Sequence, residues 1–100
     1  MKTIFDLIVK DEAAAETKDS YLWYEERKKG LGDDFLLSVQ KTLVEIKNNP
    51  FSYHKIYKNY RQAIVNRFPF TIVYEIKSQS IIVYAIFHRS RDPKRNSENE

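Results

Sequence analysis

The side chains best suited to chemistry are mostly basic and gather in the second half of the sequence. They are Lys55, Lys58, Tyr60, Arg61, Arg67, His88, Arg89 and Arg91. Arg61 and Arg67 are six positions apart in one expected strand, which would place both on the same face. If the strands of this half pair antiparallel, the whole set would converge at one edge of the sheet.

A convergent basic set has three possible uses, and the sequence leaves all three open. It can bind a phosphodiester through charge, while aromatic rings stack on bases. It can stabilise a pentavalent phosphorane, with His88 as general acid or base. It can also be nothing more than a solvated basic rim at the end of a sheet.

Other kinds of chemistry lack the residues they need. The chain has no cysteine and only two histidines, so neither a thiolate nucleophile nor a zinc site is expected. The only glycines are Gly30 and Gly32, which excludes a phosphate-cradling loop. The paired carboxylates at 25–26 and 33–34 fit helix faces and helix starts. We therefore expect no metal and no cofactor.

Charge is distributed unevenly along the chain. Residues 1–50 carry eight Lys/Arg and ten Asp/Glu, a net charge of −2, whereas residues 51–100 carry nine and four, a net charge of +5. A basic, aromatic-rich second half is compatible with an anionic partner.

The first half predicts one strand and two helices. Alternating apolar residues predict a strand over residues 3–9. A helix is expected over 12–28, with Asp11 as its N-cap, and a second over 33–48. The apolar stripe of the second helix is Leu36, Val39, Leu43 and Ile46. Gly30 and Gly32 lie between the helices and predict a tight antiparallel hairpin.

The second half predicts an antiparallel meander of three or four strands. Strands are expected over 61–68, 70–77 and 81–88, and residues 51–60 form either a short strand or an ordered loop. Pro69 requires a turn or bulge between the first two of these strands. Residues 81–88 are apolar on both faces, which predicts a central strand buried on both sides. The fold class is therefore α+β, one twisted sheet with a helical hairpin on one face.

Length and hydropathy indicate a single soluble domain over residues 1–95. Residues 96–100 contain no apolar side chain and are expected to be a disordered tail. No apolar run is long enough for a signal peptide or a bilayer span, so we expect the cytoplasm and no membrane partner. Tyr21, Trp23 and Tyr24 are expected to pack in the core, although Trp and Tyr also anchor protein interfaces.

Four blocks of the sequence resemble the RelE/ParE toxin superfamily. Residues 21–35 (YLWYEERKKGLGDDF) are similar to its helix–Gly-Leu-Gly–helix joint, and residues 46–53 (IKNNPFSY) to its Asn-Pro break. Residues 61–74 (RQAIVNRFPFTIVY) resemble its Arg-Phe-Pro-Phe strand pair, and residues 88–93 (HRSRDP) its His-x-x-Arg-x-Pro close. The resemblance covers about residues 5–95.

The resemblance implies a growth-inhibiting toxin, of a kind associated with plasmid stabilisation, that a cognate antitoxin neutralises. Tyr21, Trp23 and Tyr24 are candidate antitoxin contacts. ParE-like members poison DNA gyrase and RelE-like members cleave mRNA in the ribosome, so either is a possible partner. A third interpretation is a non-toxic relative that only binds a partner.

Departures from the RelE pattern favour the ParE-like, non-enzymatic interpretation. RelE-like nucleases resemble one another in a Tyr-Arg pair where this chain has Phe70 and Thr71, and its last tyrosine, Tyr84, lies inside a strand. The ParE side also departs, because Asn96 stands where an aromatic residue often follows the proline. If the chain is RelE-like, it is a metal-independent endoribonuclease whose candidate catalytic residues are Arg61, Arg67, His88, Arg89 and Arg91. The candidate target- or nucleic-acid-binding residues are Lys55, Lys58, Tyr60, Arg61, Arg67, Arg89 and Arg91.

Overall fold

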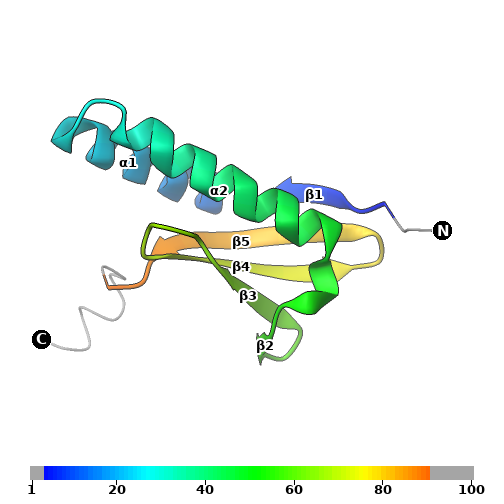
Figure 1. Cartoon of the computed structure of the whole chain (residues 1–100). Coiled ribbons are helices and arrows are strands. Elements are labelled where there is room, and N and C mark those ends of the chain that lie inside the picture. The colour runs from blue at the N-terminus through cyan, green and yellow to red at the C-terminus, as the bar shows by residue number, and fades with distance from the viewer. Residues whose placement is uncertain (1–3, 91–100) are drawn as a thin grey trace, which may run out of the picture.

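The computed structural model describes residues 4–90 and consists of one sheet with two helices on one of its faces (Figure 1). Its elements in chain order are β1 (Asp6–Val9), α1 (Asp11–Arg27), α2 (Leu31–Asn48), the 3-10 turn η1 (Pro50–Ser52), β2 (Lys55–Tyr57), β3 (Tyr60–Ile64), β4 (Phe70–Lys77) and β5 (Ser80–His88). The α+β class and the helical hairpin are confirmed. The tail at 96–100 lies outside the described residues.

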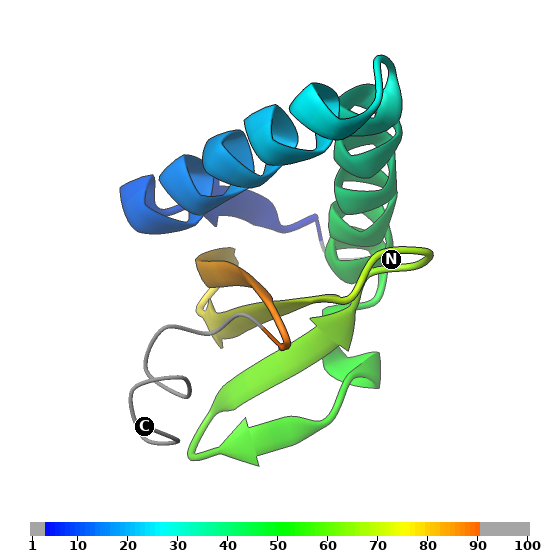
Figure 2. The ribbon, with the colours of Figure 1, turned by 90° about the vertical axis from the view of Figure 1, so that its left-hand side faces the viewer.

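The five strands form a mixed sheet in the order β1-β5-β4-β3-β2. Strands β2 to β5 make the expected antiparallel meander. Strand β1 pairs parallel to β5. Parallel neighbours need a long connection, and here both helices and strands β2 to β4 lie between the two strands in the sequence. Figure 2 shows that both helices lie on the same side of the sheet, so its other face carries no helix.

Strand β5 is central in the pairing but not buried on both faces. Ile81, Val83 and Ile86 point into the core and are fully buried. Tyr84 and Phe87 are only half-buried, since no helix covers the other face. Tyr84 is also the extra residue at a register shift between β4 and β5. The prediction of burial on both sides was wrong for that reason.

The strand expected over residues 61–68 ends at Ile64. Beyond it the Val65 amide donates to the Phe70 carbonyl at 2.9 Å, which closes the turn into β4. Within the turn, Arg67 adopts a left-handed backbone with φ of 73°. Arg61 and Arg67 therefore do not share a strand or a face, and that prediction was wrong.

The helices begin earlier than the sequence pattern indicated. Lys10, not Asp11, is the N-cap of α1, and its side chain makes no capping hydrogen bond. Asp11 is instead in the first turn of α1, where its negative charge interacts favourably with the positive end of the helix dipole. Helix α2 starts at Leu31 and contains Gly32. Val39 and Ile46 of the expected stripe are buried, whereas Leu36 and Leu43 are only half-buried, because the side turned to the core also contains Phe35 and Thr42.

A carboxylate of α1 holds the start of α2. The two Glu25 oxygens accept from the Gly30 and Gly32 amides, each at 2.9 Å, which satisfies two donors that a helix start leaves free. Gly30 has a φ of 90°, as the sharp reversal requires. A Cβ on Gly32 would lie 2.7 Å from the Tyr21 carbonyl oxygen, so only glycine allows the two helices this approach.

Removing the Glu25 carboxylate should destabilise the helical hairpin. We expect Glu25→Ala to lower the free energy of unfolding by roughly 1–3 kcal/mol, because two amides lose their acceptor. Glu26→Ala, at the exposed neighbouring position, should stay within about 0.5 kcal/mol of wild type. Urea denaturation compares the two. Equal effects would show that the Glu25 contacts do not stabilise the hairpin.

Candidate functional site

The basic residues divide into two groups at opposite ends of the sheet. Arg61 pairs with Tyr74 of β4, whereas His88 pairs with Phe70. Tyr74 and Phe70 are four positions apart in β4, a distance of roughly 13 Å along the strand. The single convergent site expected from the sequence does not form among the described residues.

The first group, here called the hairpin group, surrounds the β2–β3 turn. Its members are Lys55, Lys58, Tyr60 and Arg61. The Arg61 guanidinium is half-buried and donates to the Tyr53 carbonyl at 2.6 Å and to the Phe51 carbonyl at 3.3 Å. These bonds attach the segment after α2 to β3. Arg61 therefore has a structural role that the sequence did not reveal.

Two exposed aromatic rings accompany the hairpin group, and the sequence pattern did not indicate them as site residues. Phe51 and Tyr57 are 64% and 65% exposed. The Lys58 ammonium lies 5.4 Å from the Tyr57 ring centre. A sequence signal exists for this surface, because no carboxylate occurs between Glu45 and Glu75. The surface can contact an anionic partner through both charge and stacking.

The second group, the loop group, contains Arg67, His88 and Arg89. The Arg89 amide donates to the Pro69 carbonyl at 2.8 Å, which joins the end of β5 to the 65–69 turn. Arg67 lies 3.9 Å from Asp34 of α2, and both side chains are largely exposed. Arg91, expected beside them, lies outside the described residues.

The contacts of His88 restrict its acid–base use. The Ser90 amide donates to His88 Nδ1 at 3.1 Å, and the ring contacts Phe70 at 5.2 Å. Since Nδ1 accepts this bond, the neutral ring carries its proton on Nε2. In this arrangement Nε2–H can donate a hydrogen bond, while the Nδ1 lone pair, the basic site of the neutral ring, is occupied by the Ser90 amide.

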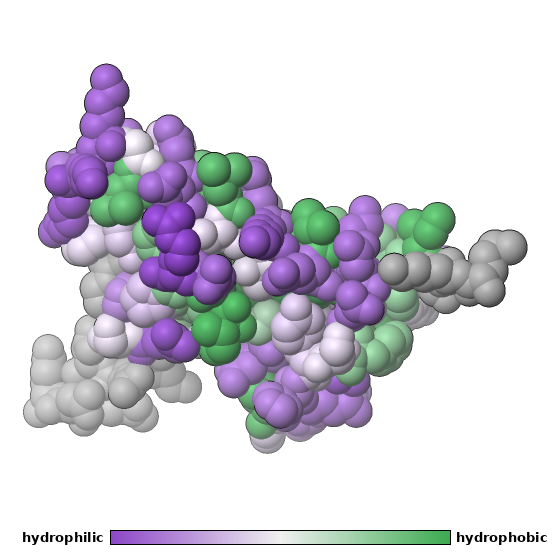
Figure 3. Space-filling model, in the orientation of Figure 1, coloured by the Kyte–Doolittle hydropathy of each residue, from purple (hydrophilic) through white to green (hydrophobic). Residues whose placement is uncertain are grey.

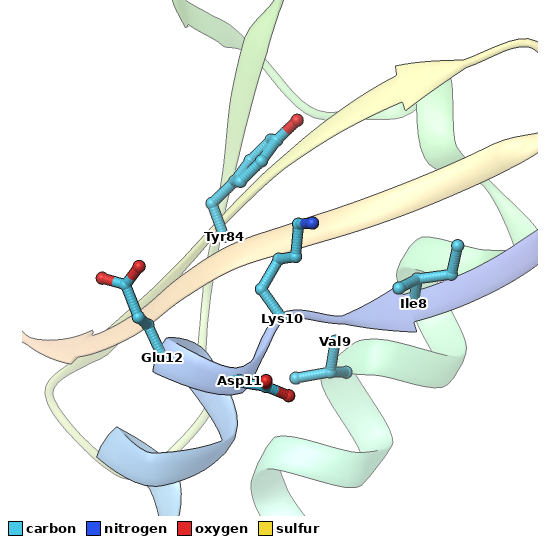
Figure 4. Close-up of a pocket in the computed structure, with 6 residues that line it drawn as sticks. All are labelled: Ile8, Val9, Lys10, Asp11, Glu12 and Tyr84. Carbon is cyan, nitrogen blue, oxygen red and sulfur yellow. The ribbon is translucent and has the colours of Figure 1, made fainter.

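The helix-free face of the sheet carries an aromatic pair and a cavity. Tyr60 and Tyr84 contact edge to face at 5.5 Å. The Tyr84 hydroxyl donates to Glu75 at 2.9 Å, and this hydrogen bond is the largest cause of its raised pKa. Beside Tyr84 is an open cavity of about 640 Å³, lined by Ile8, Val9, Lys10, Asp11, Glu12 and Tyr84 (Figure 4).

The cavity is lined by both apolar and charged side chains. In Figure 4, Lys10 and Tyr84 project to one side of the sheet and Val9 to the other. Nowhere in residues 4–90 do three metal-binding side chains gather. No helix in this part of the chain is long and apolar enough to cross a membrane.

The candidate antitoxin contacts differ in their accessibility. Tyr24 is buried among Phe35, Phe68 and Phe70, so it is a core residue. Tyr21 is half-buried at the helix joint, where the negative charge of Asp33 is the largest cause of its raised pKa. Trp23 is half-buried as well, and the Arg27 guanidinium stacks on its ring at 3.6 Å.

Comparison with known proteins identifies the family. Residues 7–93 match the family model of the ParE toxin of the type II toxin-antitoxin system parDE. The chain belongs to the ParE toxin family. This assignment confirms the superfamily and the ParE-like branch that the sequence blocks indicated.

One solved structure has the same fold as this ParE-family chain. It comes from the chromosomal ParDE toxin–antitoxin system of P. aeruginosa and matches with a TM-score of 0.65 at 19% sequence identity. The match covers 85% of this chain and 96% of the other. A search of curated proteins found no match.

The position of Arg61 predicts a stability effect. We expect Arg61→Ala to cost roughly 1–3 kcal/mol, because the Tyr53 carbonyl loses its charged donor. Lys58→Ala removes an exposed cation from the same turn and should change stability by less than about 0.5 kcal/mol. Urea denaturation measures both. An Arg61→Ala protein as stable as wild type would contradict the structural role.

The buried hydroxyl of Tyr74 leads us to expect a loss of folding stability at alkaline pH. Burial raises the pKa of its hydroxyl to about 12, and the hydroxyl donates to the Pro50 carbonyl at 2.8 Å. An unfolded tyrosine ionises near pH 10, so the stability contributed by the neutral hydroxyl is complete below about pH 10 and is lost as pH rises toward 12.

Urea denaturation between about pH 9 and 11.5 tests this expectation. Tyr74→Phe should be less stable than wild type at pH 8 by about 1 kcal/mol, through the lost hydrogen bond, and should show a smaller decline above pH 10. Tyr57→Phe, which removes an exposed hydroxyl, should decline as steeply as wild type. An unchanged slope in Tyr74→Phe would count against the assignment.

Proposed function

We propose that this chain is the toxin of a type II toxin–antitoxin module that arrests growth by binding an essential target such as DNA gyrase. A cognate antitoxin would neutralise it, and both proteins would act in the cytoplasm. Membership of the ParE toxin family is the observation that carries the proposal. The target and the antitoxin are our inference.

The arrangement of the basic residues supports a binding protein over an enzyme. Phosphodiester cleavage needs its cations and its acid–base groups around one phosphate. Here Arg61 donates to backbone carbonyls at one end of the sheet, while His88 is held at the other end. Binding to a large target needs no such convergence, and both groups can contribute to it.

We assign target contacts to the exposed cations Lys55, Lys58, Arg67 and Arg89, and include Arg91 from the sequence. Among the candidate antitoxin contacts, Trp23 is the strongest, because Tyr24 is enclosed by the core. An interface that contained Trp23 would gain both an aromatic ring and the stacked Arg27.

A RelE-like endoribonuclease is the second candidate, and the hairpin group is the observation that favours it. Exposed rings beside lysines, in a segment without carboxylates, suit single-stranded RNA. In that case the basic surface would bind mRNA, with Arg67, His88 and Arg89 as the cleaving residues nearest to one another.

Expression of the chain alone in a bacterium separates the candidates. We expect growth arrest with intact transcripts, and loss of DNA supercoiling when purified gyrase is mixed with purified protein. New mRNA 5′ ends at codon positions, with gyrase unaffected, would instead establish the nuclease. Normal growth together with active gyrase would support the third interpretation, in which the chain is a non-toxic relative that only binds a partner.

Charge reversal at the hairpin group refines this test. Lys55→Glu combined with Lys58→Glu should weaken gyrase inhibition by about tenfold or more, because two exposed target contacts reverse sign. Lys18→Glu, an exposed lysine on α1, is the matched control and should inhibit as wild type does.

A further inference from the structure

Strand β1 forms one edge of the sheet, and part of its backbone points away from the fold. The amides of Asp6 and Lys10 donate to carbonyls at positions 79 and 83, each at 2.9 Å, so the backbone groups at even positions face β5. Successive residues of a strand point their amides and carbonyls to opposite sides. Those of Leu7 and Val9 therefore face outward, and no hydrogen bond within residues 4–90 reaches them. A row of free groups of this kind is a template for another strand.

The two edges of the sheet differ in their protection against such pairing. Edge strand β2 contains Lys55, is followed by Lys58, and has a register shift against β3. Lysines and irregular pairing are devices that keep edge strands from joining. Edge strand β1 has neither, because its four residues contain no lysine and pair with β5 in one unbroken register. Ile8 of β1 is also 47% exposed.

The helices leave the outer flank of β1 uncovered. Helix α1 packs against β5 rather than against β1. Leu7 and Val9 pack against the core, yet both are only half-buried. Figure 3 shows hydrophobic surface next to the grey N-terminal atoms, at the end of the molecule where β1 begins. A strand added beside β1 would cover more of these side chains and would give the outward backbone groups their partners.

The sequence of β1 is complementary to itself when two copies run antiparallel. If a twofold axis passes through Ile8, each Ile8 faces the other, and Leu7 of each copy faces Val9 of the other. Asp6 of each copy then faces Lys10 of the other, and both of these side chains are exposed. Figure 4 shows Lys10 on the same side of β1 as Ile8, with Val9 on the opposite side. Opposite charges directly across an antiparallel pair attract each other.

Backbone geometry selects the same register. Residues of an antiparallel pair exchange hydrogen bonds only where both point their backbone groups at the other strand. Leu7 and Val9 both point outward, so each Leu7–Val9 pair can exchange two hydrogen bonds. A slip of one residue would oppose outward groups with inward ones. A slip of two would remove Lys10 from its place opposite Asp6, so only the register centred on Ile8 satisfies both the backbone and the charges.

We propose that this chain self-associates through β1, which pairs antiparallel with β1 of a second copy across a twofold axis at Ile8. The two five-stranded sheets become one continuous sheet. An axis perpendicular to the sheet keeps the helical hairpins of both copies on the same face. Pairing of two four-residue strands buries little area, so the dimer is weak and forms at high protein concentration. The inference does not depend on gyrase or on toxicity.

Sedimentation of the full chain at concentrations from about 10 µM to 1 mM tests self-association. We expect the mean mass to rise from that of a monomer toward that of a dimer. Amide hydrogen exchange, followed by NMR, locates the contact. The amides of Leu7 and Val9 should exchange several-fold more slowly at the highest concentration, whereas those of β2, at the other edge, should not change.

Charge reversal across the pair provides the decisive comparison. Asp6→Lys and Lys10→Asp each place like charges opposite one another, and each variant alone should dimerise about fivefold more weakly or worse. An equimolar mixture of the two variants restores both opposite-charge pairs and should associate at least as strongly as wild type. Asp19→Lys, at an exposed position of α1, makes the same charge change as Asp6→Lys and should dimerise as wild type does. Recovery in the mixture excludes unfolding as the cause of the single losses.

Four results would overturn the proposal. The first is a monomer at every concentration, and the second is a dimer that neither charge reversal weakens. The third is a mixture of the variants that associates no better than each variant alone. The fourth is a monomer whose Leu7 and Val9 amides are protected only by an added peptide of alternating apolar residues, since an extended segment of another protein would then occupy the edge. Every readout here is association, so failure leaves the proposed toxicity untouched.

Discussion

A cluster of four rings is the contact on which the rest of the structure depends. Tyr24 of α1 and Phe35 of α2 contact each other, and each also contacts Phe68 of the 65–69 turn and Phe70 of β4, with ring centres between 4.7 and 6.2 Å apart. Both helices meet the sheet at this cluster, and all four side chains are buried. Aromatic rings bury large areas and also favour particular mutual orientations, so the cluster fixes the position of the hairpin as well as its stability. Because Phe68 belongs to it, the cluster also fixes the path of the turn that carries Arg67.

The same constraint explains why the strand pattern failed beyond Ile64. If residues 61–68 formed one strand, Arg67 would share the buried side of Ala63 and Val65, and Phe68 would face away from the core. Burying an arginine and exposing a phenylalanine would cost far more than a left-handed residue does. The chain therefore shifts phase at Arg67, which returns Phe68 to the core and places the guanidinium outside. Alternation alone could not reveal this, because the phase shift follows from a tertiary contact with α1 and α2.

The parts of the fold that local pattern determines were predictable, and the parts that depend on distant contacts were not. The α2 stripe and the order of elements follow from apolar spacing, and the family blocks agreed with them. Glu25 looked like a solvated carboxylate in the sequence, because its two acceptor bonds join the helices only after the hairpin has closed. Arg61 looked like a free cation for the same reason, since its carbonyl partners are eight and ten residues away. The exposure of Phe51 and Leu37 likewise depends on which neighbours the fold leaves uncovered.

The division of the basic residues bears on how such a protein can act. A single phosphodiester cannot contact the cations of both groups, so a nuclease built on this sheet must use one group and not the other. A binding protein has no such restriction, because a broad interface can use charges that are far apart and gains in rate and specificity from each of them.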